Sequence, residues 1–416
     1  MAKNILALSG RTFDGEDFLE KATVLVDDSG RISEFGEDAR PDPRLKSISD
    51  SKYTILPGLM DVHMHFFGSR KEDIAEWNVI PAELASIRSV TDIRNILFAG
   101  FTTVRDLGSK SGVFLAQAEY EGDIMGPHVI SAGHSLAQTG GDDDFKGLPL
   151  DMAQKLSYSY YCDGPWECVS AVRKVIREGG EVIKLYASGG FATGGKPLPN
   201  LTVEEIRAIV EEGHRAGVKV TAHAYGEEAL INVIDAGVDS IDHGIGLTED
   251  IAEKIRKAGI YYVPTMSVYK AGRIDPHHIG LQTLLRGRSK ANRDEIVKKH
   301  VTKEIEIAMD VGLKMATGTD YVGAENSVHG NNADELVYMS EYLGPVETLR
   351  AATSRAAECV GLSNTGTLKP GNYADLVVVE GNPGKNMEDV RKNRVKFVMH
   401  NGRLYDCQNR TEIYLK

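Results

Sequence analysis

The sequence has few cysteines and no long apolar run. Its four cysteines are scattered and form no C-x-x-C motif, so neither a disulfide framework nor a redox pair is predicted, and a reducing compartment is favoured. No stretch approaches the roughly 20 apolar residues needed to cross a bilayer. The first apolar run, which ends at Leu8, is too short for a signal peptide. We therefore expect a cytoplasmic protein.

Positive charge is also in short supply. The formal net charge is -12 over 416 residues, and no basic cluster offsets it, which argues against nucleic acid or an anionic membrane as a partner. Hydrophobic content of 42% and charged content of 26% are ordinary for a globular protein. We expect a small-molecule substrate and a homo-oligomer, with no nucleic-acid or membrane partner.

Both ends of the chain show the pattern of β-structure. Short apolar runs alternate with turns over residues 1–56, including a hairpin-type turn at residues 27–30, and a similar alternation returns over residues 365–416. Neither terminal segment is expected to form a stable sheet alone. We expect one small β-sandwich domain assembled from both termini.

Between these ends, residues 57–364 alternate strand-like and helix-like segments. Helix signals include Thr202 with Glu205 at the capping-box spacing, and a segment from Thr248 that closes at Gly259. Eight parallel strands with helical crossovers predict an α/β fold, the (β/α)8 TIM barrel. An open doubly wound sheet is the rival, but no Gly-rich dinucleotide turn follows the first strand. The predicted strands are 59–65, 102–106, 128–132, 182–186, 218–223, 239–243, 260–264 and 314–318.

Residues with metal-ligand chemistry stand at the ends of these strands. His63 and His65 are two apart, so both project to the same side of the first strand. His223, His243 and Asp320 end or follow the fifth, sixth and eighth strands. One strand-end histidine is usually structural, and an aspartate after a strand is commonly a helix cap. Together the five predict a metal site, because barrel enzymes place their chemistry at this end of the strands.

The remaining histidines lie mostly in helices, loops or the terminal β-structure, and we interpret them as structural. His134 alone stays a candidate, because it follows the third strand. The full set is His128, His134, His214, His277, His278, His300, His329 and His400.

Lys184 lies inside an apolar strand, between Ile183 and Leu185. A buried ammonium is costly, and burial beside metal cations lowers its pKa and favours the neutral amine. A neutral amine can add carbon dioxide to give a carbamate that bridges two metals. The alternative is a lysine that reaches an exposed carboxylate. Given the strand-end histidines, we predict the carboxylated form.

With these residues in place, the chain resembles the amidohydrolase superfamily, in its binuclear-metal branch, over essentially its whole length. Part of it more narrowly resembles the prolidase-like Xaa-Pro and Xaa-Arg dipeptidases among the imidazolonepropionase-related amidohydrolases. Those enzymes remove a C-terminal amino acid from dipeptides or N-acyl amino acids. The superfamily motifs match at 57–65, 100–106, 183–184, 222–224, 242–244, 318–320 and 366–376, and the dipeptidase motifs match at 137–141, 187–190 and 223–225.

The resemblance implies two divalent metal ions, expected to be zinc, and hydrolysis of a C–N bond by attack of a metal-bridging hydroxide. The implied ligands are His63, His65 and Asp320 for the more buried metal, His223 and His243 for the second, and carboxylated Lys184 as the bridge. Asp320 would also take the proton of the hydroxide and deliver it to the leaving amine. Tyr225 would contact the substrate near the scissile carbonyl, although packing inside the barrel explains it equally well.

One segment departs from the dipeptidase pattern. Those enzymes commonly have a histidine directly after Thr-Gly-Gly, whereas this chain has Asp142, Asp143 and Asp144. Such an acidic cluster would repel a substrate carboxylate, recruit a cationic side chain, or form a solvated loop. The tyrosine-rich segment 146–165 follows, and either a substrate loop or a subunit contact would explain it.

Two other functions stay open at this point. A deaminase, or a hydrolase of a cyclic amide, lactone or carbamate, shares the barrel and the His-x-His strand, but the mononuclear deaminases resemble this chain less at Lys184. A barrel protein that has lost its metal and its activity is disfavoured, because the full ligand set is present.

Overall fold

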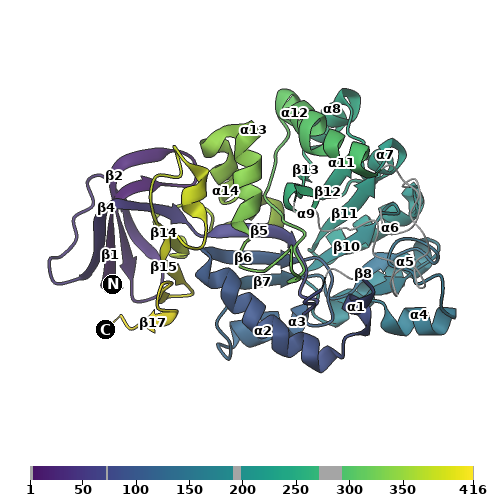
Figure 1. The fold of residues 1–416 in the computed structure, drawn as a ribbon, viewed down its shortest axis with the longest axis horizontal. Helices are drawn as coiled ribbons and strands as arrows, with labels where there is room; N and C mark the ends of the chain where they lie inside the picture. Colours follow the sequence, from purple (N-terminus) through teal and green to yellow (C-terminus); the bar gives the residue numbers. More distant parts are fainter. Residues whose placement is uncertain (1–2, 72–73, 191–197, 271–292, 416) are drawn as a thin grey trace.

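The computed structural model describes residues 3–71, 74–190, 198–270 and 293–415. Strands from both chain ends gather at one side of the molecule, and a larger α/β part occupies the other (Figure 1). His277 and His278 of the sequence analysis lie outside the described residues. Within these ranges, no helix combines the length and the apolar character that crossing a bilayer requires.

The terminal strands form one eight-stranded sheet in the order β17-β16-β15-β14-β4-β1-β2-β3. β4 and β14 run antiparallel, with Leu56 opposite Val377, so the two chain ends join in the middle of the sheet. Alternate residues such as Leu6 and Leu8 face its apolar core. The strands are β1 (Asn4–Phe13), β2 (Phe18–Asp27), β3 (Ile32–Gly36), β4 (Lys46–Pro57), β14 (Leu376–Glu380), β15 (Val395–His400), β16 (Arg403–Asp406) and β17 (Thr411–Ile413).

This sheet differs from the expectation in two respects. All eight strands belong to a single hydrogen-bonded sheet, so the predicted sandwich of two facing sheets is not confirmed. Strand β4 is also not predicted by the sequence pattern, because most of its first half is polar and exposed and only its last four residues are buried.

The larger part contains two parallel sheets. One has the order β5-β6-β7, and the other has the order β13-β12-β11-β10-β8-β9. Seven of the eight predicted parallel strands coincide with observed ones, and β8 and β9 are additional. The bounds are β5 (Leu59–Met64), β6 (Phe101–Asp106), β7 (His128–Ser131), β8 (Ser135–Ala137), β9 (Ser159–Tyr161), β10 (Val182–Tyr186), β11 (Lys219–Tyr225), β12 (Ser240–Ile245) and β13 (Tyr261–Val263).

Residues 314–321 connect the two parallel sheets. Tyr262 of β13 donates its N–H to Lys314 O at 2.9 Å, and Val62 of β5 donates to Thr317 O at 2.8 Å. The prediction of a regular strand over 314–318 is nevertheless wrong, because this segment forms only isolated bridges. Thr317 donates its N–H to a helix carbonyl, that of Ala351, instead of a strand.

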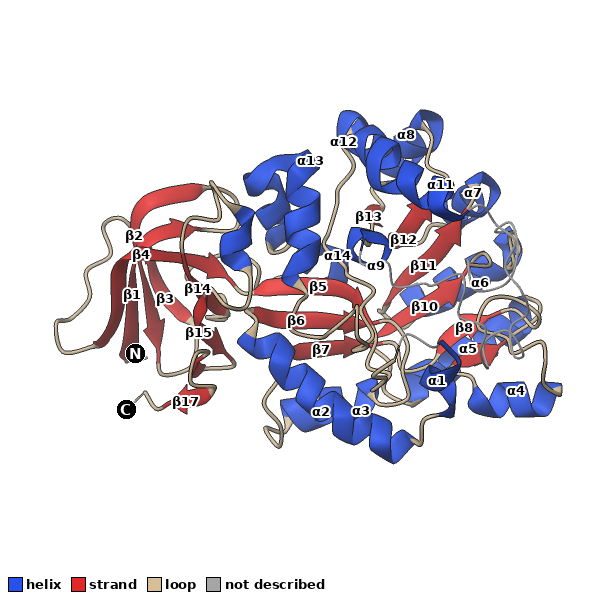
Figure 2. Cartoon of the chain, viewed as in Figure 1, coloured by secondary structure: helices blue, strands red, loops and turns tan. Residues whose placement is uncertain are grey.

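Helices surround the parallel sheets (Figure 2). The predicted capping box at Thr202 and Glu205 is confirmed, and the predicted helix end at Gly259 adopts the left-handed conformation, φ 71°. The α-helices are α1 (Ile74–Val79), α2 (Ala82–Phe98), α3 (Gly112–Tyr120), α4 (Leu150–Leu156), α5 (Pro165–Arg177), α6 (Val203–Arg215), α7 (Glu227–Ala236), α8 (Glu249–Ala258), α9 (Met266–Lys270), α11 (Arg293–Lys299), α12 (Ile305–Val311), α13 (Ala333–Ala351) and α14 (Ser354–Val360). The segment 146–165 is not a plain loop, since it contains α4 and β9.

Candidate metal centre

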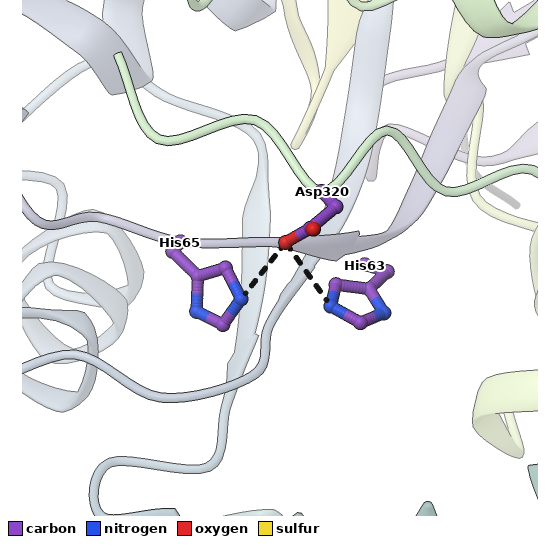
Figure 3. A group of neighbouring side chains, drawn as sticks. All are labelled: His63, His65 and Asp320. Atoms are coloured by element: carbon purple, nitrogen blue, oxygen red, sulfur yellow. Dashed lines mark ion pairs between the residues drawn. The ribbon is translucent and has the colours of Figure 1, made fainter. Parts of the chain in front are cut away.

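His63 and His65 lie at the end of β5 and point toward Asp320 (Figure 3). Asp320 Oδ1 is 3.5 Å from His63 Nε2 and 3.3 Å from His65 Nε2. One ligand atom from each of the three side chains lies within 4.8 Å of the others. Because two imidazoles and a carboxylate at this spacing suit a divalent ion such as zinc, the group can hold a metal.

Asp320 reaches this position through an unusual backbone. Its φ is 57°, in the left-handed region that non-glycine residues rarely adopt. Its N–H donates to His63 O at 2.7 Å, which holds the residue beside β5. The preceding Thr319 donates both its N–H and its hydroxyl to the buried carboxylate of Asp61, two residues before His63. These contacts stabilise a strained residue at the site.

His65 is oriented by its second ring nitrogen. Nδ1 lies 2.9 Å from the carbonyl oxygen of Gly108, which accepts a hydrogen bond and so places the proton on Nδ1. The lone pair of Nε2 then faces Asp320. The ring also stacks on Phe67, with centroids 4.8 Å apart and an interplanar angle of 12°. This arrangement is the one expected for a metal-binding histidine.

His223 and His243 lie next to this group, at the ends of β11 and β12. Their ring centroids are 4.8 Å apart, and the ring of His243 is 5.0 Å from that of His63. Burial, together with the charge of Lys184, lowers the pKa of His223 to about 3. Burial and the neighbouring histidines hold the pKa of His243 well below its usual range. Both rings are therefore neutral near pH 7 and free to donate a lone pair.

The contacts of these two rings also fit metal ligation. His243 Nδ1 is 2.7 Å from the hydroxyl of Thr265, which leaves its Nε2 for the site. Buried His223 Nε2 has no hydrogen-bond partner among the residues that the structure describes. An orphaned buried nitrogen is rare in folded proteins, and a metal ion explains it.

Lys184 is buried on β10, and its Nζ donates to Asp242 Oδ2 at 2.9 Å. The alternative interpretation of a lysine reaching an exposed carboxylate is wrong, since Asp242 is also fully buried. Burial lowers the pKa of Lys184, and the charge of Asp242 opposes that shift. Although burial alone would raise the pKa of Asp242, Lys184 and His63 hold it well below its usual range.

Tyr225 is buried beside both histidines of this second group. Its ring centroid is 4.3 Å from that of His223 and 5.3 Å from that of His243. Its hydroxyl is 2.7 Å from the hydroxyl of Tyr269 on α9. The residue therefore lies beside the two histidines, and its hydroxyl belongs to a hydrogen-bonded tyrosine pair.

The three aspartates after Gly141 are buried, so the interpretation as a solvated loop is wrong. Asp143 accepts a hydrogen bond from the hydroxyl of Ser157, and Asp144 accepts one from Gly140 N, both at 2.7 Å. Asp142 approaches the candidate centre. A Cβ on Gly190 would lie 3.3 Å from Asp142 Oδ2 and 3.6 Å from the His223 ring.

His134 lies away from this group. Its Nδ1 is 2.9 Å from Glu178 Oε2, and its ring stacks on Tyr160 with centroids 4.4 Å apart. Asp242, in contrast, contacts the site although the sequence places it only within the motif at 242–244 and predicts no role for it. Strand alternation would place adjacent Asp242 and His243 on opposite faces, but His243 has a φ of 65° and leaves the extended conformation. A charged residue inside an apolar strand is the signal that could have identified Asp242.

The chain is similar to an ochratoxinase in sequence, and to a prolidase and a Xaa-Pro dipeptidase in structure. The chain is 31% identical over 427 residues to the ochratoxinase of Aspergillus niger, covering 94% of this chain and 84% of that protein. A prolidase solved in complex with N-methylphosphonate-L-proline superposes with a TM-score of 0.85 at 31% identity, covering 96% and 99% of the two chains. A Xaa-Pro dipeptidase with bound methionine gives a TM-score of 0.83 at 28% identity, covering 96% and 99%.

These relatives confirm the resemblance to prolidase-like enzymes that the motifs indicate. The sequence profile of the amidohydrolase family matches residues 54–405 and so includes His63, Lys184 and Asp320. The chain is an enzyme that belongs to the amidohydrolase family.

Proposed function

We propose that this protein is a metal-dependent hydrolase that cleaves the C–N bond of a dipeptide or an N-acyl amino acid. The observation that carries the proposal is the convergence of His63, His65 and Asp320 to within 4.8 Å, from segments far apart in the sequence. The likeness to a prolidase and to a Xaa-Pro dipeptidase supports a small substrate that ends in an amino acid.

We also propose that the two parallel sheets form a (β/α)8 barrel over residues 57–364, with a small β-domain from residues 1–56 and 365–416. Residues 314–321 bond to both β13 and β5, which supports closure on one side. On the other side, Glu181 donates its N–H to Ser131 O of β7 at 2.8 Å, just before β10. In such a barrel the carboxyl ends of the strands share one rim, where the ligand residues lie.

Two divalent metal ions, zinc being the first choice, are proposed to bind at this rim. The neutral, buried state of His223 and His243 supports their part as ligands. The proposed ligands are His63, His65 and Asp320 for one ion, His223 and His243 for the other, and carboxylated Lys184 between them. Carboxylation would remove the ammonium charge of Lys184 from beside Asp242, whose other partners include Thr221, 2.9 Å from Oδ2.

Bound divalent ions would lower the pKa of a water molecule and polarise the substrate carbonyl. The chain supplies the rest of the chemistry. Asp320 is proposed to accept the proton of the attacking water at its carboxylate and to return it to the leaving nitrogen. The Tyr225 hydroxyl, held by Tyr269, is proposed to donate a hydrogen bond to the carbonyl oxygen of the substrate. His63, His223 and His243 are buried, so these side chains have little contact with bulk water.

The metal ligands do not determine which side chain the substrate carries, so other residues near the site must select it. Asp142 and His223 both adjoin Gly190, since a Cβ there would lie 3.3 Å from Asp142 Oδ2 and 3.6 Å from the His223 ring. The Asp142 carboxylate is proposed to place negative charge near the site. A substrate with a basic residue would be favoured by this charge, and one with an acidic residue would be disfavoured.

Metal analysis of protein purified without chelator, followed by a screen of dipeptides and N-acyl amino acids, tests the proposal. We expect close to two divalent ions per chain and release of a free amino acid. His63→Ala should lose metal, whereas His134→Ala, which removes a histidine paired with Glu178, should keep it. One ion per chain with release of ammonia would instead identify a deaminase and contradict the proposal.

A further inference from the structure

We infer that Asp242 is a positioning residue for the candidate metal centre, which orients His63 and holds Lys184. Asp242 lies on β12 and its side chain is completely buried. The part that concerns metal affinity rests on the proposed function, whereas the orientation of His63 is a property of the chain itself.

The carboxylate of Asp242 contacts four other strands. Through these contacts it joins the three-stranded sheet to the six-stranded sheet across the interior of the molecule. The contacts are Oδ2 to Lys184 Nζ of β10 at 2.9 Å, Oδ2 to Thr221 Oγ1 of β11 at 2.9 Å, Oδ1 to His63 Nδ1 of β5 at 3.2 Å and Oδ1 to Arg105 Nη2 of β6 at 3.6 Å.

The Asp242 carboxylate lies beside one nitrogen of the His63 ring as an ion-pair contact, without a hydrogen bond between the two groups. Nδ1 faces the carboxylate of Asp242, while Nε2 faces Asp320 at 3.5 Å. A carboxylate beside Nδ1 favours the proton on that nitrogen, which leaves the lone pair of Nε2 for a metal. His65 and His243 have neutral partners at Nδ1, a carbonyl and a hydroxyl. Among these three rings, His63 is the one whose Nδ1 faces an anion.

Arg105 keeps a positive charge next to this carboxylate. Its side chain is only 2% exposed, and its Nε donates to Val62 O at 2.6 Å, beside His63. A guanidinium stays protonated in proteins. Asp242 therefore retains a cationic partner when Lys184 carries a carbamate in place of its ammonium. Asp242 thus has two cationic neighbours, Arg105 and Lys184, and the pairing with Arg105 does not depend on the form of Lys184.

The tautomer of His63 in metal-free protein tests the inference independently of metal binding. Nitrogen-15 NMR of histidine-labelled protein, assigned with His63→Gln, should show a protonated Nδ1 on His63. In Asp242→Asn, the proton of His63 should shift toward Nε2. An unprotonated Nδ1 in the wild-type protein would overturn the inference.

Metal affinity, measured by competition with a zinc-binding dye, gives the second readout. Asp242→Asn should weaken zinc binding 10- to 100-fold, the usual effect of removing such a partner. The matched control is Asp375→Asn, which breaks another buried aspartate–histidine pair, 2.7 Å from His400 Nδ1 in the terminal sheet. The control should lower thermal stability and leave zinc affinity unchanged.

The outcomes separate the two claims. Zinc affinity in Asp242→Asn equal to that of wild type would refute the positioning role and leave the proposed function intact. A wild-type protein that binds no zinc would refute the proposed function, and the His63 tautomer would still decide whether Asp242 orients that ring.

Discussion

Lys184 Nζ and Asp242 Oδ2 lie 2.9 Å apart, and neither side chain is more than 1% exposed. A buried ion pair is poor at stabilising a fold, because removing both charges from water offsets most of their attraction. Its presence in the middle of parallel strands therefore indicates a functional requirement.

Lys184→Ala should lose bound metal and catalytic activity together, each by at least about 100-fold, because the proposed bridge between the ions is removed. Metal content after gel filtration and turnover of the best substrate measure the two effects. Lys219→Ala is the matched control, since Lys219 pairs with Asp239 at 2.8 Å on the partly exposed start of β11. A Lys184→Ala protein that keeps full metal and activity would refute the bridge.

Acid should destabilise the metal-free protein through His223. Its pKa is lowered from 6.5 to about 3 in the folded state, so the unfolded chain binds a proton first as the pH falls. Above the unfolded pKa, His223 does not change the free energy of unfolding. Below it, this free energy falls by about 1.4 kcal/mol for each pH unit. Urea unfolding of chelated protein at about pH 6 and about pH 4 should give a shallower pH slope for His223→Gln than for wild type. Equal slopes would contradict the assignment.

Alkali should destabilise the terminal sheet through His400. Burial opposes its charge, but Asp375 and Glu119 prevail and raise the pKa of His400 to about 9. Stability from this ion group is fully present below the unfolded pKa of 6.5 and is lost as the pH rises through about 9. The total is up to about 3 kcal/mol. Unfolding free energies at about pH 6 and pH 10 should differ less for His400→Gln than for wild type.

Gly58→Ala should destabilise the junction between β4 and β5. A Cβ at this position would lie 1.9 Å from Thr102 Oγ1 and 2.5 Å from Thr102 Cγ2, an overlap that costs about 1–3 kcal/mol or more. Buried Thr102 Oγ1 has no hydrogen-bond partner within the described part of the chain, so Thr102→Ala should cost little by itself. The double variant should recover part of the loss in thermal unfolding. Because alanine at position 102 keeps its Cβ, 2.7 Å from the added Cβ, Thr102→Gly completes the test. No recovery in the Gly58→Ala Thr102→Gly double variant would show that the clash is not the cause.

Local patterns predict much of this fold. The capping box at Thr202 and the helix end at Gly259 depend on residues a few positions apart, and both are confirmed. The period of two places His63 and His65 on one side of β5, and both face Asp320. These features need no knowledge of distant contacts.

The remaining features depend on tertiary contacts. Residues 314–318 have the composition of a strand, but a bond from Thr317 to Ala351 O and the left-handed Asp320 interrupt its ladder. Asp242 escapes prediction for a similar reason, since the left-handed φ of His243 breaks the alternation of faces. Such conformations are stabilised by the surrounding structure, so the strand period alone does not predict them, and the charge inside an apolar strand is the only local sign of Asp242.

The pairing of β4 with β14 has a consequence for synthesis on the ribosome. Thr54 donates its hydroxyl to Gly381 O, and the two residues are 327 positions apart. While the chain emerges, the edge of β4 that pairs with β14 stays open until residue 381 has been translated. Open edges recruit strands from other chains, so we expect this edge to be a site of aggregation in the nascent chain until β14 covers it.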